Sequence, residues 1–472
     1  MEKYFSIIPK PLSIKYNEGF YQSKEIPSVI KKETDFTGHE ELCRNEAYRL
    51  IIDKEKITVE AQTRAGMHHG AETFRQLSLS GYKDGFLTLP CAEITDYPRF
   101  SWRGFMLDCS RYFYTVPFIK KLLDALSLHH INRFHWHLTD DQGWRFNVPE
   151  YPLLTEIGSI RKNYRARWQP PSGGFYTDDE IRDVINFAGL RHIEVIPEVD
   201  LPGHACAILA SYPGLSCTGG PYEVEERFGI FEDVLCAGND RILDLFEKVL
   251  NTLIRLFPSK WVHIGGDEVL YNRWEACPKC RNRQKELGLE KTADLQSWIT
   301  YNLVRMLSER GRTAVGWDEI LDDTEKFRLP AEAVIMSWRG DEGGKKAASL
   351  GHNVIMSPNT MGCYLDYKHI NTPEEPGQLF EGSASVYKTY SMDPGIAGRE
   401  ALILGGQGNM WSELIYAGKF AEYMIFPRIC AIAESTWTMK EGKDFNDFES
   451  RLSVHRQRLD ALGINQYRGP LK

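Results

Sequence analysis

The sequence predicts an α/β protein, a (β/α)8 TIM barrel preceded by a small α+β domain. From Ser101 onward a short apolar run, a loop and an amphipathic segment follow one another repeatedly. This order is typical of parallel strands joined by helical crossovers. Eight such runs can be counted, which is the number that closes a barrel. We therefore expect a small domain at residues 1–97 and a barrel domain at residues 98–472 that ends in closing helices.

The first 97 residues show a different pattern. Residues 48–52 and 57–61 alternate apolar and polar side chains around a short charged turn, which predicts a β-hairpin. Residues 64–79 carry an apolar stripe at helical spacing. Pro90 and Pro98 bracket the expected domain boundary. No chemical cluster stands out here, so we expect structural support from this domain.

The barrel elements follow in regular order. The eight predicted strands are residues 104–108, 133–138, 194–198, 262–265, 313–317, 334–338, 353–356 and 401–405. Predicted helices with apolar stripes are residues 116–128, 178–190, 241–256 and 294–309. Residues 421–462 are expected to form the closing helices.

Carboxylates, histidines and tryptophans follow nearly every predicted strand. The fourth strand is the clearest example, since the apolar run from Trp261 ends in two glycines and then Asp267 and Glu268. Other strand exits carry His135 to Trp144, Glu198 to His204, Trp317 to Glu319, Trp338, Tyr364 to Asp366 and Asn409 to Glu413. In a parallel barrel these ends meet at one face, where ligands bind. The pattern predicts a site there.

Composition excludes several classes of partner. The net charge of -8, from 65 acidic and 57 basic residues without a long basic cluster, argues against nucleic acid and anionic membranes. The sequence contains no run of about 18 apolar residues, so no membrane span is expected. The start lacks a secretory leader, so we expect a cytoplasmic protein as the sequence stands, or a periplasmic or secreted one if a leader was trimmed. The 11 tryptophans and 22 tyrosines offer flat faces on which sugars can bind.

We expect no cofactor and no metal ion. Cys277 and Cys280 have the spacing of half a zinc site, but no second Cys-x-x-Cys completes a four-ligand set. One alternative is a metal-dependent hydrolase, because His135 and His137 share a strand face and acids lie nearby. Another is a sugar-binding protein without catalysis, because a fold does not fix a function.

The chemistry favours glycoside hydrolysis, which needs one acid to protonate the leaving oxygen and a group that stabilises an oxocarbenium-like centre. Asp267 and Glu268 are sequence neighbours. On an extended backbone neighbouring side chains point in opposite directions, so they are not expected to face each other as acid and nucleophile. This leaves room for a nucleophile supplied by the substrate.

Several motifs then carry a family resemblance. They are Trp102 to Gly104, Leu107 to Arg111, His135 to Gly143, Ile196 to His204, His263 to Glu268, Gly316 to Glu319, Tyr364 to Asp366 and Gly408 to Glu413. With them, residues 99–472 resemble a family 20 glycoside hydrolase, the β-N-acetylhexosaminidases. Residues 1–97 resemble the small α+β domain that precedes the barrel in that family.

The resemblance implies an exo-acting, retaining enzyme that removes terminal non-reducing β-linked N-acetylglucosamine or N-acetylgalactosamine, with a carbohydrate as its partner. The catalysis implied is substrate-assisted, through an oxazolinium intermediate. Glu268 would be the general acid and then the base. Asp267 would accept the acetamido N–H and stabilise the positive intermediate, and Tyr364 would donate to the acetamido oxygen.

The resemblance also implies roles around these three residues. Trp317, Trp338 and Trp411 would wall the pocket. Sugar hydroxyls would be held by Arg103, Asp366 and Glu413, and the acid would be oriented by Asp141 and His204. His137 is expected to be structural. Cys217 and Cys236 occupy positions where some relatives have a disulfide, and whether they pair depends on the compartment.

Overall fold

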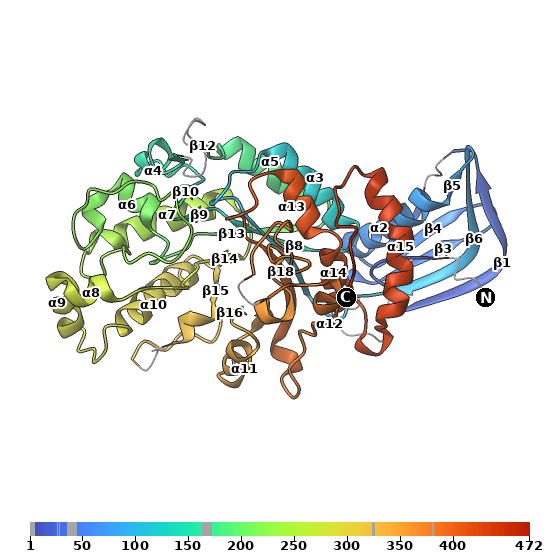
Figure 1. Cartoon of the computed structure of the whole chain (residues 1–472). Coiled ribbons are helices and arrows are strands. Elements are labelled where there is room, and N and C mark those ends of the chain that lie inside the picture. The colour runs from blue at the N-terminus through green and yellow to red at the C-terminus, as the bar shows by residue number, and fades with distance from the viewer. Residues whose placement is uncertain are drawn as a thin grey trace.

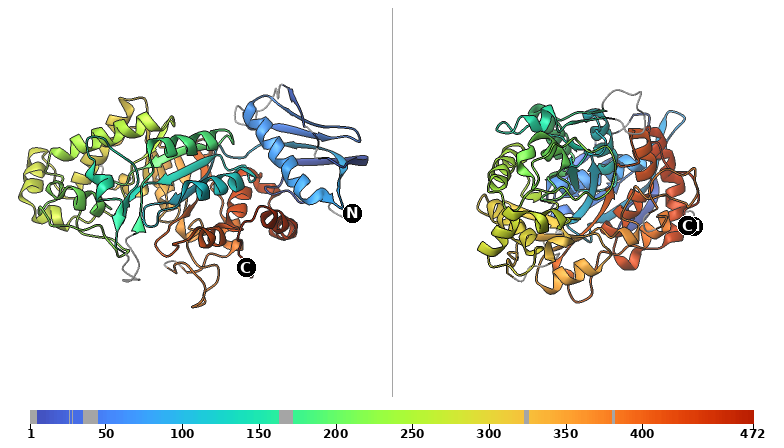
Figure 2. Two further views of the ribbon diagram at one scale, coloured as in Figure 1. Left: turned by 90° about the horizontal axis from the view of Figure 1, so that it is seen from above. Right: turned by 60° about the vertical axis from the view of Figure 1, so that its left-hand side comes forward.

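A computed structural model describes residues 5–25, 27, 29–34, 45–162, 172–322, 326–379 and 382–472. Figure 1 shows a sheet of the N-terminal residues at one end of the molecule and the barrel at the other. In the second view of Figure 2, helices ring the barrel strands. No helix in the described part of the chain is long and apolar enough to cross a bilayer.

The N-terminal sheet has the strand order β1-β6-β3-β4-β2, with β5 paired to β6. Its strands are β1 (Ser13–Ser23), β2 (Ile30–Glu33), β3 (Tyr48–Ile52), β4 (Ile57–Ala61), β5 (Tyr82–Lys83) and β6 (Phe86–Asp96). The predicted hairpin is confirmed as the antiparallel pair β3 and β4. The predicted helix is α2 (Arg64–Gly81), which buries Phe74 and Leu77 against the sheet.

The barrel is closed, in the order β13-β14-β15-β16-β17-β18-β7-β8, and its strands are parallel. This confirms the predicted fold class. The bounds are β7 (Trp102–Asp108), β8 (Arg133–His137), β13 (Glu194–Glu198), β14 (Trp261–His263), β15 (Thr313–Trp317), β16 (Val334–Ser337), β17 (Val354–Met356) and β18 (Ile403–Met410).

The last strand differs most from the prediction, because it continues through a glycine-rich stretch to Met410. Glycine disfavours strands, so the sequence pattern ended it at Gly405. The structure shows why glycine is needed there: a Cβ on Gly405 would lie 1.9 Å from the carbonyl oxygen of Trp102 on β7. The two backbones approach too closely for any side chain.

The predicted helices are confirmed with small shifts at their ends. The crossovers contain α3 (Val116–Ser127), α5 (Asp178–Gly189), α7 (Arg241–Leu256), α10 (Asp294–Ser308), α11 (Glu342–Ser349) and α12 (Val386–Ser391). Shorter helices in the loops are α4 (Leu153–Glu156), α6 (Cys206–Ser211), α8 (Asn272–Ala276) and α9 (Pro278–Glu286). The closing helices are α13 (Gly418–Ile425), α14 (Arg428–Trp437) and α15 (Phe445–Ala461).

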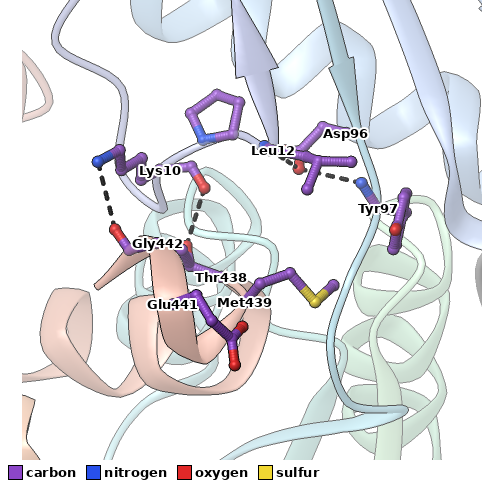
Figure 3. A pocket seen from close by; sticks show the side chains of 9 residues that line it. Lys10, Leu12, Asp96, Tyr97, Thr438, Met439, Glu441 and Gly442 are labelled. Atoms are coloured by element: carbon purple, nitrogen blue, oxygen red, sulfur yellow. Dashed lines mark hydrogen bonds between the residues drawn. The ribbon is translucent and has the colours of Figure 1, made fainter.

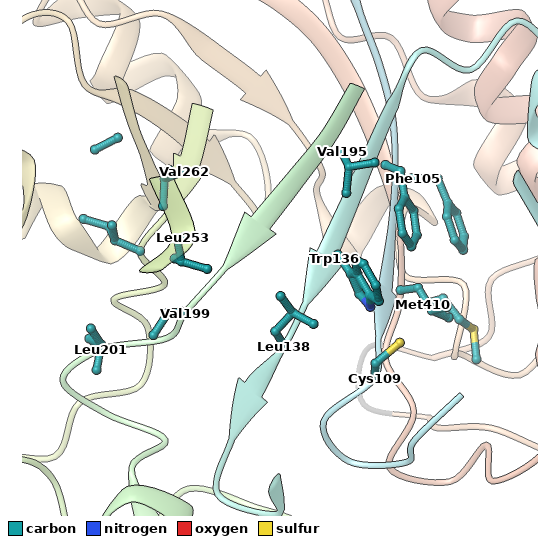
Figure 4. Close-up of a cluster of buried hydrophobic side chains, with 14 of the residues drawn as sticks. Phe105, Cys109, Trp136, Leu138, Val195, Val199, Leu201, Leu253, Val262 and Met410 are labelled. Atoms are coloured by element: carbon teal, nitrogen blue, oxygen red, sulfur yellow. The ribbon is translucent and has the colours of Figure 1, made fainter. Parts of the chain in front are cut away.

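Alternate residues of the barrel strands enter two different cores. Phe105, Trp136, Val195 and Val262 belong to the large cluster that includes Leu253 of α7 (Figure 4). A second cluster contains barrel-strand residues that alternate with those of the first, among them Met106, Ile196, Val315, Met336 and Ile355. Because successive strand side chains point to opposite faces, one set packs under the helices and the other fills the barrel.

The N-terminal part is attached to the closing helices by specific hydrogen bonds. Figure 3 shows a small pocket where the two meet, with Lys10 Nζ donating to the Gly442 carbonyl at 3.2 Å and Thr438 Oγ1 donating to the Lys10 carbonyl at 2.8 Å. Beside it Trp437 Nε1 donates to Asp96 Oδ2 at 2.9 Å. Burial raises the pKa of Asp96 to about 7.

The predicted role of Arg103 in holding a sugar hydroxyl is wrong. Arg103 is the second residue of β7, at the opposite end from the strand's carboxyl end, and it is completely buried. Its guanidinium pairs with Glu46 and donates to the carbonyls of Phe100 and His130, each at 2.8 Å. It also lies over the ring of Trp437, 4.9 Å from its centroid. Arg103 therefore joins the barrel base to the N-terminal domain.

Replacing Arg103 with methionine should lower the free energy of unfolding by about 3–5 kcal/mol, because Glu46 would lose its permanently charged partner in a largely buried site and keep only the His69 ring, 2.8 Å away. Urea unfolding of the intact protein measures this loss. Arg49→Met is the matched control, since the Arg49–Glu60 pair is partly exposed and should contribute about 0–1 kcal/mol. A loss for Arg103→Met no larger than for the control would contradict the assignment.

Candidate active site

Asp267 and Glu268 follow a sharp turn, so the expectation of an extended backbone at these residues is wrong. The fourth strand ends at His263, and Gly265 and Glu268 have φ of 66° and 54°. A Cβ on Gly265 would lie 1.8 Å from Asp200 Oδ1, so only glycine fits. As a result both carboxylates reach the same histidine, His204, rather than opposite sides of a strand.

His204 connects four acids in the buried part of the site. Its Nε2 lies 3.5 Å from Glu268 Oε2 and 4.0 Å from Asp267 Oδ2. Its Nδ1 lies 3.0 Å from Asp141 Oδ2 and 3.1 Å from Asp140 Oδ1. Burial lowers the pKa of His204, but Asp140 and hydrogen bonds to the acids outweigh this and raise it well above its usual range. A charged His204 can therefore hold Glu268 in place.

Asp267 lies beside a second buried acid, Asp200, with one carboxylate oxygen of each within 4.8 Å of the other. Burial raises the pKa of Asp200 to about 6, and burial together with the Asp200 charge raises that of Asp267 well above its usual range. Two like charges in one buried site disfavour double ionisation, so the pair retains a proton. Asp267 Oδ1 makes no hydrogen bond within the described part of the chain, which leaves an acceptor free for a ligand.

Aromatic rings lie around these acids. Trp338 and Tyr364 are stacked with centroids 6.0 Å apart, and Trp411 lies 6.2 Å from Tyr364. Trp317 is fully buried, 5.8 Å from Trp411, and donates from Nε1 to Glu198 at 3.0 Å. The structure thus brings the three predicted tryptophans and Tyr364 together, with Trp317 forming a covered floor.

Glu319 was not among the predicted site residues. Its carboxylate accepts a hydrogen bond from Trp338 Nε1 at 2.7 Å. Burial, followed by the nearby Asp267 charge, raises its pKa to about 9. Arg339 Nε lies 3.7 Å from the same carboxylate. The position of Glu319 in the strand-exit motif after Trp317 was the available signal.

Asp366 and Glu413 form a second acidic pair, and Arg111 accompanies them. Burial and the Glu413 charge raise the pKa of Asp366, and burial raises that of Glu413. Arg111 lies 3.8 Å from Glu413, pairs with Asp140 at 2.9 Å and covers the Trp411 ring at 4.9 Å. Arg103 was the arginine predicted to bind sugar, although Arg111 follows the carboxyl end of the same strand. That position was the signal for a site residue.

Glu198 supports the site from below. His135 Nε2 and His263 Nδ1 lie 2.8 and 2.9 Å from its oxygens, and His137 connects it to Asp140, whose Oδ2 is 2.8 Å from His137 Nε2. Burial opposes a charge on His137, but Glu198 and both hydrogen bonds raise its pKa well above the usual range. These contacts support the structural role expected for His137.

Comparison with known proteins identifies the family. Residues 100–440 match the catalytic domain of glycosyl hydrolase family 20, and residues 23–97 match domain 2 of that family. The chain belongs to glycosyl hydrolase family 20. It is therefore a glycoside hydrolase by family, as the resemblance predicted.

Individual relatives agree with this family. The chain is 39% identical to a beta-hexosaminidase of Porphyromonas gingivalis over 90% of this chain and 55% of that protein. It is 31% identical to a beta-hexosaminidase of Akkermansia muciniphila over 96% of this chain and 90% of that protein. A family 20 exo-β-N-acetylglucosaminidase of Vibrio harveyi, solved with N-acetylglucosamine, superposes with a TM-score of 0.89 at 31% identity over 99% of this chain and 79% of that one. The chain thus spans little more than half the length of the Porphyromonas relative.

Asp200→Asn should move the acidic limb of the pH profile of kcat/KM to lower pH. Removing the Asp200 charge removes the repulsion that raises the pKa of Asp267, so Asp267 ionises at lower pH. The asparagine oxygen can still accept the Gly266 N–H that Asp200 accepts at 2.9 Å. Asp179→Asn is the control, because that side chain is 93% exposed on α5. An acidic limb that stays fixed or moves to higher pH would contradict the coupling.

Proposed function

We propose that this chain is an exo-acting, retaining β-N-acetylhexosaminidase. It would hydrolyse terminal non-reducing β-linked N-acetylglucosamine or N-acetylgalactosamine by substrate-assisted catalysis through an oxazolinium intermediate. The observation that carries the proposal is the pair Asp267 and Glu268 after β14, with His204 beside both. The names of the Porphyromonas and Vibrio relatives support the same substrate class.

In the first step Glu268 protonates the glycosidic oxygen while the acetamido oxygen of the sugar attacks the anomeric carbon. The bond to the leaving group breaks and a cyclic oxazolinium forms. In the second step Glu268 accepts a proton from water, the water oxygen attacks the anomeric carbon, and the acetamido group is restored. Two inversions give net retention of configuration, and general acid–base catalysis of this kind contributes about 10²–10⁴-fold.

Asp267 and Tyr364 would act on the acetamido group. The free Oδ1 of Asp267 is an acceptor for the acetamido N–H, and a negative Asp267 stabilises the positive ring that forms. Burial raises the pKa of Tyr364 well above its usual range, so its hydroxyl stays protonated and can donate to the acetamido oxygen. Each group favours the cyclised form over the ground state.

The remaining residues would bind and orient. Asp141 contacts His204 Nδ1, and His204 Nε2 faces Glu268, so the two residues orient the Glu268 carboxyl group. Asp366, Glu413 and Arg111 offer acceptors and donors for sugar hydroxyls, and Glu413 Oε2 has no hydrogen-bond partner among the described residues. Trp338 and Trp411 provide the flat faces against the sugar.

Substrate assistance predicts a strong preference between two matched substrates. An aryl β-N-acetylglucosaminide should be hydrolysed at least about 10³-fold faster than the aryl β-glucoside, because the glucoside lacks the internal nucleophile. Initial rates with the same aryl leaving group measure this. Comparable rates would reject substrate assistance, and sugar binding with no turnover of either substrate would identify a non-catalytic binding protein.

Glu268→Gln and Asp267→Asn should fail in different ways. Glu268→Gln should lose about 10²–10⁴-fold on substrates with poor leaving groups and much less on activated aryl substrates, which need little protonation. Asp267→Asn should lose about 10²–10³-fold even on activated substrates, because it weakens charge stabilisation in the ring-closing step. Glu309→Gln, at an exposed residue directly after α10, serves as the control. An unimpaired Asp267→Asn enzyme would refute its role.

A further inference from the structure

Four cysteines from three separate segments meet beside the barrel. Cys217 follows the short 3-10 helix Pro213–Leu215, Cys236 precedes α7, Cys277 caps the start of α9, and Cys280 lies in the first turn of α9. All four are free thiols, and their sulfur atoms lie within 4.8 Å of one another. The sequence spacing indicates only Cys277 and Cys280 as possible metal ligands, because Cys217 and Cys236 do not form a Cys-x-x-Cys.

The spacing of the sulfur atoms fits a tetrahedral metal site. Cys217 and Cys280 are 3.7 Å apart, Cys236 and Cys280 are 3.6 Å apart, and Cys236 and Cys277 are 3.9 Å apart. Four sulfurs at the usual Zn–S length of about 2.3 Å lie about 3.8 Å from one another in a tetrahedron. A disulfide would instead bring one pair to about 2 Å and leave the other sulfurs outside it. Here Cys236 lies 3.6 Å from Cys280 and 3.9 Å from Cys277, so neither distance is that of a bonded pair.

The backbone around the cluster is arranged to hold these positions. An antiparallel bridge between Ser216 and Leu235 places Cys217 and Cys236 on the same face of the two paired segments, one on each segment. The Cys236 N–H donates to the Leu215 carbonyl at 2.9 Å. A Cβ on Gly238 would lie 2.5 Å from the Cys280 nitrogen. Only glycine allows the Cys236 segment to rest directly on the first turn of α9.

The burial of the four cysteines and the charges around them also fit a closed site of metal-bound thiolates. Cys236, Cys277 and Cys280 are buried, and only Cys217 is partly accessible. Four thiolates around one divalent ion carry a net charge of about -2. The neighbouring helix α9 offers its N-terminus and a basic sequence to offset this charge, with Lys279, Arg281, Arg283 and Lys285.

We propose that Cys217, Cys236, Cys277 and Cys280 bind one structural Zn²⁺. Each thiol releases its proton to solvent on binding, so the four ligands are thiolates and no position is left for water or substrate. This differs from the expectation of no metal, and from a disulfide between Cys217 and Cys236. The inference rests on the cysteine geometry alone and does not depend on the proposed function.

The ion would join the loop after β13 to the loop after β14. The first of these loops contacts the site, since the Leu235 N–H donates to the Pro202 carbonyl at 3.1 Å and the Glu225 N–H donates to the Asp141 carbonyl at 3.1 Å. The second follows directly from Glu268, and Trp274 Nε1 of α8 donates to the Leu235 carbonyl at 2.8 Å. The zinc would thus fix the loops that carry His204 and Glu268.

Metal analysis of the full-length protein, purified without chelators, tests the proposal directly. Inductively coupled plasma mass spectrometry should find about one zinc per chain, and zinc X-ray absorption should show four sulfur neighbours at about 2.3 Å. Cys277→Ser and Cys280→Ser should each lose most of this zinc. Cys91→Ser is the matched control, because Cys91 is a buried free thiol on β6 outside the cluster, and it should keep the metal.

A second measurement protects the test against variants that fail to fold. Releasing zinc from the wild-type protein with a mercurial, read with a zinc-sensitive dye, should lower the melting temperature. Removing the mercurial with excess thiol and adding Zn²⁺ should restore it, whereas Mg²⁺ should not. Protein of full stability that contains no zinc, that contains iron in its place, or that shows a disulfide between any two of the four cysteines would overturn the proposal.

Discussion

A buried carboxylate, Asp200 at the exit of β13, sets the shape of the turn that carries Asp267 and Glu268. Its Oδ1 accepts the Gly266 N–H at 2.9 Å and leaves no space for a Cβ on Gly265. The same side chain raises the pKa of Asp267 by its charge. One residue therefore sets the backbone of the turn and the direction of Asp267 and Glu268, and it favours the protonated form of Asp267. Without it, the two glycines would only make a flexible turn.

Much of the fold could be predicted because buried parallel strands read as short apolar runs with regular spacing. The prediction ended early only at β18, where glycines are required by contact with the Trp102 backbone rather than by strand preference. Asp141, His204, Tyr364 and the tryptophans followed from strand exits and family motifs. What the sequence could not show was how the turn after His263 folds, since that depends on Asp200 from another strand.

The two arginines of β7 and its exit illustrate a different limit. Arg103 and Arg111 lie in the same group of motifs, and residue type does not separate them. Their positions along the strand do, because Arg103 is the second residue of the buried strand and Arg111 follows Asp108 at its carboxyl end. The prediction of no metal site missed the four-cysteine cluster for a related reason. Spacing rules detect metal ligands that lie a few residues apart in the sequence. Cys217 and Cys236 are far apart in the sequence and are brought together only because their loop folds back through the Ser216–Leu235 bridge.

The two ends of the barrel differ in how their buried charges are balanced. At the barrel base, Arg103 and Glu46 neutralise each other. At the top, burial and like charges raise the pKa of Asp200 to about 6 and of Glu319 to about 9, and they also raise the pKa of Asp267.

A carboxyl group whose pKa is higher in the folded protein than the unfolded value of about 4 binds more protons when folded. The free energy of unfolding therefore falls as the pH rises from the unfolded pKa of such a carboxyl group to its higher pKa in the folded protein. The raised pKa of His204 acts in the same direction above its unfolded value of about 6.5. The folded site thus favours added positive charge, which a cationic intermediate provides directly. The features that reduce stability at the top of the barrel are those that would stabilise a cationic ring on the reaction path.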